Sequence, residues 1–162
     1  MSIKLLITGG TIDKAYNLHN GELHFVDTHV PEMLGEGRCR ADIELETLML
    51  KDSLEMTDAD RETIVEACKA APQQRIVITH GTDTLTDTAG YLQRRVEGKV
   101  IVLLGAMVPW VFRHSDAAFN LGAAISAVQC LPPGVHVVMN GQLFAAGRVR
   151  KNREEGVFEA IG

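Results

Sequence analysis

Four short runs rich in Val, Ile and Leu constrain the fold more than any other feature of this chain. They span residues 3–7, 75–79, 99–104 and 135–139. Each run is almost continuously apolar, which is typical of strands buried on both faces in a parallel sheet covered by helices. Helical patterns lie between these runs, at residues 57–71, 84–96 and 115–130. The alternation predicts an α/β fold: a doubly wound, mainly parallel sheet flanked by helices.

Local signals support two of the helix starts. Thr57 and Asp60 have the spacing of a capping box, in which the two side chains satisfy free N–H groups at the first turn. One face of that helix would then carry Ile64, Val65 and Cys68. Ser115 followed by Asp116 suits a helix N-cap and the positive end of the helix dipole.

Two Asn-Gly pairs predict hairpin turns, because both residues tolerate the positive φ angles that such turns require. Asn20-Gly21 would lie at the tip of a β-hairpin flap over residues 15–26, directly after the first strand. Asn140-Gly141 would follow the last parallel strand.

Length and composition restrict the class of protein. With 162 residues, the chain is expected to form a single domain over residues 1–162. Its net charge of −5 argues against a nucleic-acid partner. No apolar run approaches the roughly 20 residues of a membrane span, and the start of the chain predicts a strand rather than a signal peptide. Three widely spaced cysteines do not suggest disulfides, which favours a cytoplasmic location.

The residues that directly follow the apolar runs are the candidates for a functional site. In open α/β sheets, ligands bind outside the carboxyl ends of the strands. The segments at that edge would be residues 8–13, 80–84, 105–109, 140–141 and 148–151. They bring two hydroxyl-bearing loops, the carboxylate of Asp83 and the ammonium of Lys151 to one place.

Each candidate also has a simpler interpretation. The segment Thr8-Gly9-Gly10-Thr11 is compatible with a plain turn or a nucleotide loop, although its glycine spacing fits neither common nucleotide motif. Asp83 is placed to cap the following helix, and Lys151 lies among arginines that are typical of a solvated face. The functional interpretation makes Thr11 a nucleophile and Thr82 with Lys151 a proton relay.

Four motifs together resemble the bacterial-type L-asparaginase/glutaminase family. They are Ile-Thr-Gly-Gly-Thr-Ile at residues 7–12, His-Gly-Thr-Asp-Thr at 80–84, Gly-Ala-Met-Val-Pro at 105–109 and Ser-Asp-Ala-Ala-Phe-Asn-Leu at 115–121. All four occur in the order that the family shows, and the resemblance covers essentially the whole chain. It implies the fold of the family's N-terminal domain.

The resemblance also implies roles for individual residues. Thr11 matches the attacking threonine of the family, and Thr82, Asp83 and Lys151 match its second threonine, the adjacent aspartate and the lysine paired with them. The remaining matches are Ser53, which would hold the α-carboxylate of the substrate, and Tyr16, the nearest candidate for the flap tyrosine. Gly10 and Gly81 would also contact the substrate.

Three departures from the family pattern stand out. The chain ends at Gly162, where the family usually continues into a C-terminal domain, so we expect a short stand-alone form. Leu54 stands where long secreted members have a glutamine that contacts the substrate amino group. The flap is also short. All three predict a more open pocket that binds substrate weakly.

The sequence therefore predicts an L-asparaginase that forms a threonine acyl-enzyme and needs neither metal nor cofactor. Two alternatives stay open: a non-catalytic amino-acid-binding or regulatory module, and an amidase that acts on another amide. We expect a homo-oligomer, a dimer or tetramer, with Trp110 and Phe112 as interface candidates. For Phe119 and Leu121, an interface and the internal core are equally compatible with the sequence.

Overall fold

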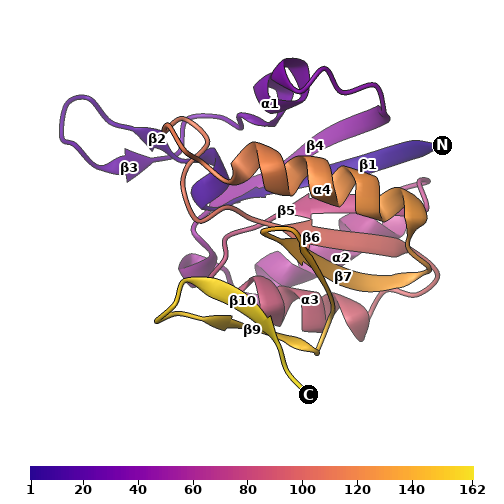
Figure 1. Cartoon of the computed structure of the whole chain (residues 1–162). Coiled ribbons are helices and arrows are strands. Elements are labelled where there is room, and N and C mark those ends of the chain that lie inside the picture. The colour runs from indigo at the N-terminus through magenta and orange to yellow at the C-terminus, as the bar shows by residue number, and fades with distance from the viewer.

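A computed structural model describes all 162 residues and shows helices on both faces of one central sheet (Figure 1). The sheet has six strands in the order β4-β1-β5-β6-β7-β8. These strands are β1 (Ser2–Gly9), β4 (Asp42–Lys51), β5 (Arg75–Thr79), β6 (Val100–Leu104), β7 (Gly134–Met139) and β8 (Gln142–Ala145). All neighbouring pairs are parallel except β7 and β8, which are antiparallel.

Four α-helices flank the sheet, and none of them is both long and apolar enough to cross a bilayer. They are α1 (Val30–Glu36), α2 (Asp58–Ala70), α3 (Leu85–Gln93) and α4 (Ala117–Cys130). Figure 1 shows α1 and α4 on one face of the sheet and α2 and α3 on the other. The predicted doubly wound α/β fold is confirmed.

The sheet separates two apolar cores. Alternate residues of the buried strands point to opposite faces, so Leu6 and Ile78 pack with α2 and α3, whereas Leu5 and Val77 pack with α4. Strands β5 and β6 are apolar nearly throughout because both of their faces are covered.

The capping box at the start of α2 is present. The Thr57 hydroxyl accepts from the Asp60 N–H, and the Asp60 carboxylate accepts from the Thr57 N–H. The predicted apolar face of this helix, which carries Ile64, Val65 and Cys68, is fully buried.

At the start of α4 the prediction was wrong by one residue, since the N-cap is Asp116 and not Ser115. The Ser115 hydroxyl still accepts from the N–H of Ala117, at 3.0 Å. The Asp116 carboxylate instead accepts from the N–H groups of Met107 and Val108, which ties the loop after β6 to the helix.

Three hairpins project from the sheet or extend it. Asn140 and Gly141 have φ angles of 49° and 80° and form the tight turn between β7 and β8. The flap consists of β2 (Ala15–Tyr16) and β3 (Leu23–His24), with Asn20-Gly21 in its connecting loop. The last hairpin pairs β9 (Val149–Asn152) with β10 (Val157–Ala160). In Figure 1 the flap and the last hairpin both project at the end of the sheet where β1 ends.

Candidate active site

The first candidate loop leaves the end of β1 and carries Thr11. Gly9 and Gly10 have φ angles of 99° and 82°, which other residues rarely adopt, and they turn the chain into the short 3-10 helix η1 (Thr11–Asp13). The N–H of Gly10 donates to the carbonyl of Lys51, at 2.9 Å. Thr11 is half-buried, and its hydroxyl forms no hydrogen bond within the protein. The loop therefore presents a hydroxyl that is free to react.

The second candidate loop follows β5 and packs directly against the first. A Cβ atom at Gly10 would overlap the backbone of Gly81, and one at Gly81 would lie 2.6 Å from the side chain of Ser53. The loops can touch only because neither glycine has a side chain. The N–H groups of Gly81 and Thr82 have no acceptor in the protein. Two free backbone donors thus lie beside the Thr11 loop.

Lys151 joins the last hairpin to the second loop. Its Nζ atom donates to Thr82 Oγ1 at 2.8 Å and to Asp83 Oδ1 at 2.8 Å, and only 13% of its side chain is exposed. Charge-assisted hydrogen bonds of this kind are roughly twice as strong as neutral ones. Sequence positions about 70 residues apart therefore meet in one polar cluster.

Arg153 also contacts Asp83. Its guanidinium donates to Asp83 Oδ1 at 3.0 Å and to the Asp83 carbonyl at 3.1 Å. The sequence pattern predicts only a solvated face for this arginine, and its side chain is 60% exposed. No sequence signal distinguishes it from Arg148 or Arg150.

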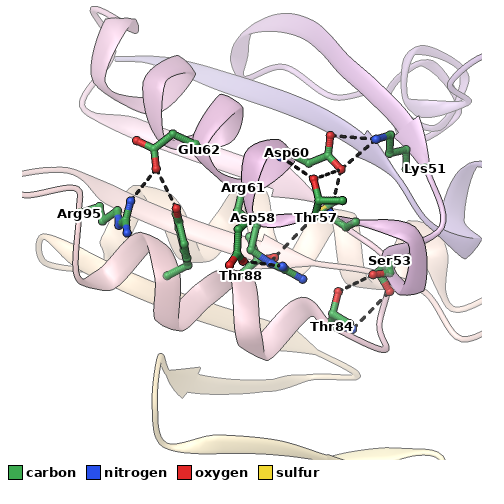
Figure 2. Close-up of polar contacts among 12 residues, drawn as sticks. Lys51, Ser53, Thr57, Asp58, Asp60, Arg61, Glu62, Thr84, Thr88 and Arg95 are labelled. Carbon is green, nitrogen blue, oxygen red and sulfur yellow. Dashed lines mark hydrogen bonds and ion pairs between the residues drawn. The ribbon is translucent and has the colours of Figure 1, made fainter.

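Ser53 lies next to both loops, in the short 3-10 helix η2 (Ser53–Glu55). Its hydroxyl accepts from the Thr84 N–H at 3.3 Å, and its carbonyl accepts from the Thr84 hydroxyl at 2.8 Å, as Figure 2 shows. The serine is buried and its hydroxyl proton is not used in these contacts. Leu54 beside it is 67% exposed.

An ion pair joins the loops that carry Thr11 and Ser53. Lys14 Nζ lies 2.6 Å from Asp52 Oδ2. The hydrogen bond from Lys14 holds the pKa of Asp52 below its ordinary value, and the charge of Lys151 acts in the same direction. Asp52 also accepts from the N–H of Leu54, which fixes the start of η2.

A chain of buried hydrogen bonds supports the second loop from below. Arg61 Nε donates to the Thr88 hydroxyl at 3.1 Å, a contact drawn in Figure 2, and Thr88 lies 2.8 Å from His80 Nε2. His80 Nδ1 lies 2.7 Å from the carbonyl of Gly81, and it carries the proton because a carbonyl only accepts. Burial lowers the pKa of His80 to about 4. The histidine is therefore neutral and holds the loop.

A second buried polar group supports the first loop. Asp13 is fully buried at the end of η1 and accepts from the Thr28 hydroxyl and from the N–H of His29. Burial raises the pKa of this carboxyl above its ordinary value, although both hydrogen bonds oppose the shift. Its second oxygen has no partner in the protein.

Tyr16 forms no hydrogen bond with either threonine. The side chain is 49% exposed, and its hydroxyl lies close to Gly21 in the loop of the flap rather than within hydrogen-bond distance of Thr11. Its ring packs edge-on against Phe112, with 6.3 Å between the ring centroids. The flap thus rests on the loop that follows β6.

The interface candidates divide into covered and exposed residues. Trp110 is partly buried, packs against the core beside α4 and stacks near His29 at 5.4 Å. Phe112 remains partly exposed. Leu121 is buried in the core, whereas Phe119 is 63% exposed.

The chain is similar to known proteins over nearly its whole length. A family model described as "Asparaginase, N-terminal" matches residues 2–160. A glutamyl-tRNA(Gln) amidotransferase subunit of Methanococcus vannielii is 35% identical over 153 residues, covering 88% of this chain and 35% of that protein. An L-asparaginase of Thermococcus kodakarensis is 32% identical over 168 residues, covering 99% of this chain and 51% of that protein.

Solved structures agree with the sequence matches. The thermostable L-asparaginase of T. kodakarensis has a TM-score of 0.88 at 31% identity, with 99% of this chain and 51% of that chain covered. The chain thus spans about a third to a half of the length of these relatives. The match to the family model, the relatives and the fold agree, and the chain belongs to the asparaginase family.

Proposed function

We propose that this protein is an amidohydrolase that converts L-asparagine to L-aspartate and ammonia through a threonine acyl-enzyme. One observation carries the proposal: the Lys151 ammonium lies 2.8 Å from both Thr82 Oγ1 and Asp83 Oδ1, beside the loop of Thr11. A plain turn or a solvated lysine would not need this arrangement. The ammonium of Lys151 and the hydroxyl of Thr82 are within hydrogen-bond distance, so a proton can pass between them.

Thr11 is the proposed nucleophile. Its Oγ1 attacks the side-chain amide carbon, and the carbonyl oxygen of the amide becomes negatively charged. The free N–H groups of Gly81 and Thr82 are suited to stabilise that oxygen, a contribution commonly worth 10²–10³ in rate. Because the N–H of Gly10 already donates to Lys51, Gly10 would contribute its small size and not a hydrogen bond.

The rest of the reaction moves protons and releases the products. The proton of Thr11 passes to the amide nitrogen, with Thr82 and Lys151 as the relay. The carbon–nitrogen bond then breaks, ammonia leaves, and an ester joins the aspartyl group to Thr11. Water attacks this ester, Thr11 regains its proton and aspartate is released. Every step uses groups of the chain, and the proposal includes no metal and no cofactor.

Two further residues would orient the substrate. The Ser53 hydroxyl accepts from Thr84 and keeps its own proton for the α-carboxylate. Asp83 has one oxygen occupied by Lys151 and Arg153, which leaves Oδ2 for the α-ammonium. Fixing both groups would hold the amide over Thr11. Tyr16 would assist Thr11 only after the flap moves toward it, because no hydrogen bond joins the two in this structure.

The direct test is ammonia release from L-asparagine by the purified protein, with L-glutamine as a second substrate. Release of ammonia with equimolar aspartate supports the proposal. Binding of asparagine without turnover would instead indicate an amino-acid-binding or regulatory module.

The relatives named as glutamyl-tRNA(Gln) amidotransferase subunits favour a second candidate, an amidase that acts on a different amide. The same protein assayed with a panel of ω-amides separates the two. Turnover of another amide at a much higher kcat/KM than asparagine would support the second candidate.

We further propose a cytoplasmic homo-oligomer of dimer or tetramer size, as the sequence indicates. The exposed Phe112 and Phe119 are compatible with a contact between copies. Light scattering after size-exclusion chromatography tests this proposal. A mass of 17.7 kDa in the fully active protein would contradict it.

A further inference from the structure

Asp83 has more cations around it than a binding site for an ammonium group needs. One oxygen, Oδ1, accepts from Lys151 at 2.8 Å and from Arg153 at 3.0 Å. A second hydrogen bond, from Arg153 to the Asp83 carbonyl, fixes the guanidinium in place. Two positive charges therefore share one carboxylate, and the cluster of three side chains is positive overall.

Lys151 and Arg153 differ in what else they contact. Lys151 is nearly buried and also donates to Thr82, so its charge has a place in the proposed proton relay. Arg153 contacts Asp83 alone among the proposed site residues. Its charge is not needed for the relay, and its effect on a ligand acts through Asp83.

A free α-ammonium at Asp83 Oδ2 would be the third cation around a single carboxylate. Oδ2 itself has no partner, but Lys151 and Arg153 already balance the single negative charge of the carboxylate, and both would repel a third cation bound beside them. A ligand with no charge at this position would not meet that repulsion. Such a cluster would favour a ligand without an α-ammonium over the matching free amino acid.

We propose that Arg153 is a specificity-determining residue that shifts the site away from a free α-ammonium and toward ω-amides that lack one. The class includes succinamate, which is asparagine without its amino group, and asparagine whose amino group is acylated. This inference rests on the proposed function, because it assumes that Asp83 faces the α-position of the substrate. The inference extends the proposed substrates from asparagine to ω-amides that lack an α-ammonium.

The test compares asparagine with succinamate in the wild-type protein and in the Arg153→Gln and Arg153→Lys variants. The readout is the ratio of the two kcat/KM values at low ionic strength. Arg153→Gln should raise the ratio in favour of asparagine about three- to tenfold, since one repelling charge is removed. Arg153→Lys keeps the charge but loses the forked pair of hydrogen bonds to Asp83, so it should change the ratio less than Arg153→Gln does. Because Arg153 is largely exposed, added salt should shrink the difference.

Arg150→Gln is the matched control. Arg150 is an exposed arginine on the same hairpin, but it pairs with Glu159 and not with Asp83. The ratio should not change in this variant. An unchanged ratio in Arg153→Gln, or an equal loss for both substrates, would show that Arg153 only supports the fold of the loop and would overturn the inference.

A binding measurement keeps this result separate from the fate of the proposed reaction. Aspartate and succinate differ by the same α-ammonium, and their Kd values are obtained by calorimetry without turnover. If Arg153→Gln favours aspartate by a similar factor while no amide is hydrolysed, the inference stands and the proposed reaction fails. If amides are hydrolysed but neither ratio changes, the reaction stands and the inference fails. If the protein neither binds these ligands nor hydrolyses any amide, both the proposed reaction and the inference about Arg153 fail.

Discussion

The two threonine loops reach the same edge of the sheet but are held there in different ways. The Thr82 loop is fixed by side chains: Lys151 donates to the threonine itself, and His80 holds the carbonyl of Gly81 from the buried side. The Thr11 loop is fixed next to the threonine by backbone contacts, through the N–H of Gly10 and the packing of Gly10 on Gly81. The side chains that support it, Asp13 and Lys14, lie farther along the loop. The hydroxyl of Thr11 itself has no partner.

This difference matches the two proposed roles. A nucleophile must move its oxygen toward the substrate, so a free hydroxyl on a rigid turn suits Thr11. A proton relay must keep its geometry through the reaction, so the charged partner of Thr82 suits that role. Variants that affect one loop and spare the other can therefore separate effects on turnover from effects on the stability of the fold.

The largest expected effect is that of Thr11→Ala, which should lower turnover and leave stability almost unchanged. Thr11→Ala should lower turnover of asparagine at least ~10²-fold, because it removes the nucleophile. Its free energy of unfolding should stay within about 0.5 kcal/mol of wild type, because the hydroxyl forms no hydrogen bond within the protein and the residue is only half-buried. Ammonia release and urea denaturation measure the two quantities. Turnover near the wild-type rate would mean that another residue attacks.

Lys151→Met tests the relay in the other loop and should also lower turnover at least ~10²-fold. Unlike Thr11→Ala, this variant should lower the free energy of unfolding, since it removes one of the two cations on Asp83 and the donor to Thr82. Circular dichroism checks that the fold is retained. A variant that keeps full activity would remove Lys151 from the proposed mechanism.

The pH dependence of stability should report the buried histidine. The pKa of His80 is about 4 in the folded protein, below the ordinary 6.5. Above pH 6.5 both states are neutral and the full stability is present. As pH falls from 6.5 toward 4, only the unfolded state takes up the proton, so stability falls by up to about 3 kcal/mol.

His80→Asn is the control for this titration. Asparagine can keep a donor near the Gly81 carbonyl but does not titrate in this range. The variant should therefore lose less stability than wild type between about pH 7 and pH 4.5, the window set by the lowered pKa, as measured by urea denaturation at each pH. Equal slopes for the two proteins would contradict the assignment.

Thr88→Val should affect the stability of the protein more than its turnover of asparagine. The substitution keeps the shape of the side chain but leaves Arg61 Nε and His80 Nε2 without their shared hydroxyl. We expect a loss of about 1–3 kcal/mol in the free energy of unfolding, the usual cost of unpaired buried polar groups. Thr86→Val on the same helix is the matched control and should lose far less. A stability equal to wild type would show that the buried chain of hydrogen bonds is dispensable.

The smallest effect on stability should come from breaking the ion pair that joins the first loop to η2. Lys14→Met removes the partner of Asp52, and we expect a loss of about 0.5 kcal/mol, since the pair is partly exposed. The pKa of Asp52 should rise toward its ordinary value, because the hydrogen bond that lowers it is gone. Carboxyl chemical shifts followed by NMR during an acid titration measure this change. An unchanged titration would contradict the role given to Lys14.

The sequence predicted the parts of the fold that repeat a simple pattern. Strands β1, β5, β6 and β7 are nearly continuous apolar runs because both their faces are covered, and all four lie close to their predicted bounds. Strand β4 was missed because it is not a continuous apolar run; its acidic residues alternate with apolar ones, a pattern that is typical of a strand with one covered face. Helix α1 was missed as well, since it has only seven residues, with a proline and a glycine among them.

The site was predictable to the extent that its residues follow strands. Thr82 and Asp83 follow β5 and lie at the edge that the rule for strand ends selects. Lys151 lies within β9, and its pairing with them was expected from the family resemblance. Arg153 and Thr88 have no such marker: an arginine in a basic hairpin and a threonine in a helix are common everywhere. Their contacts depend on the three-dimensional packing of distant segments, which one sequence does not encode in a visible pattern.

The contact between Gly10 and Gly81 has a consequence for protein engineering. Loops usually tolerate mutation better than cores do, yet here any side chain at either position meets backbone or Ser53. A library that randomises both positions should return glycine at each among its active members. Substitutions aimed at new substrates are better placed at Leu54 and Arg153, whose side chains reach solvent.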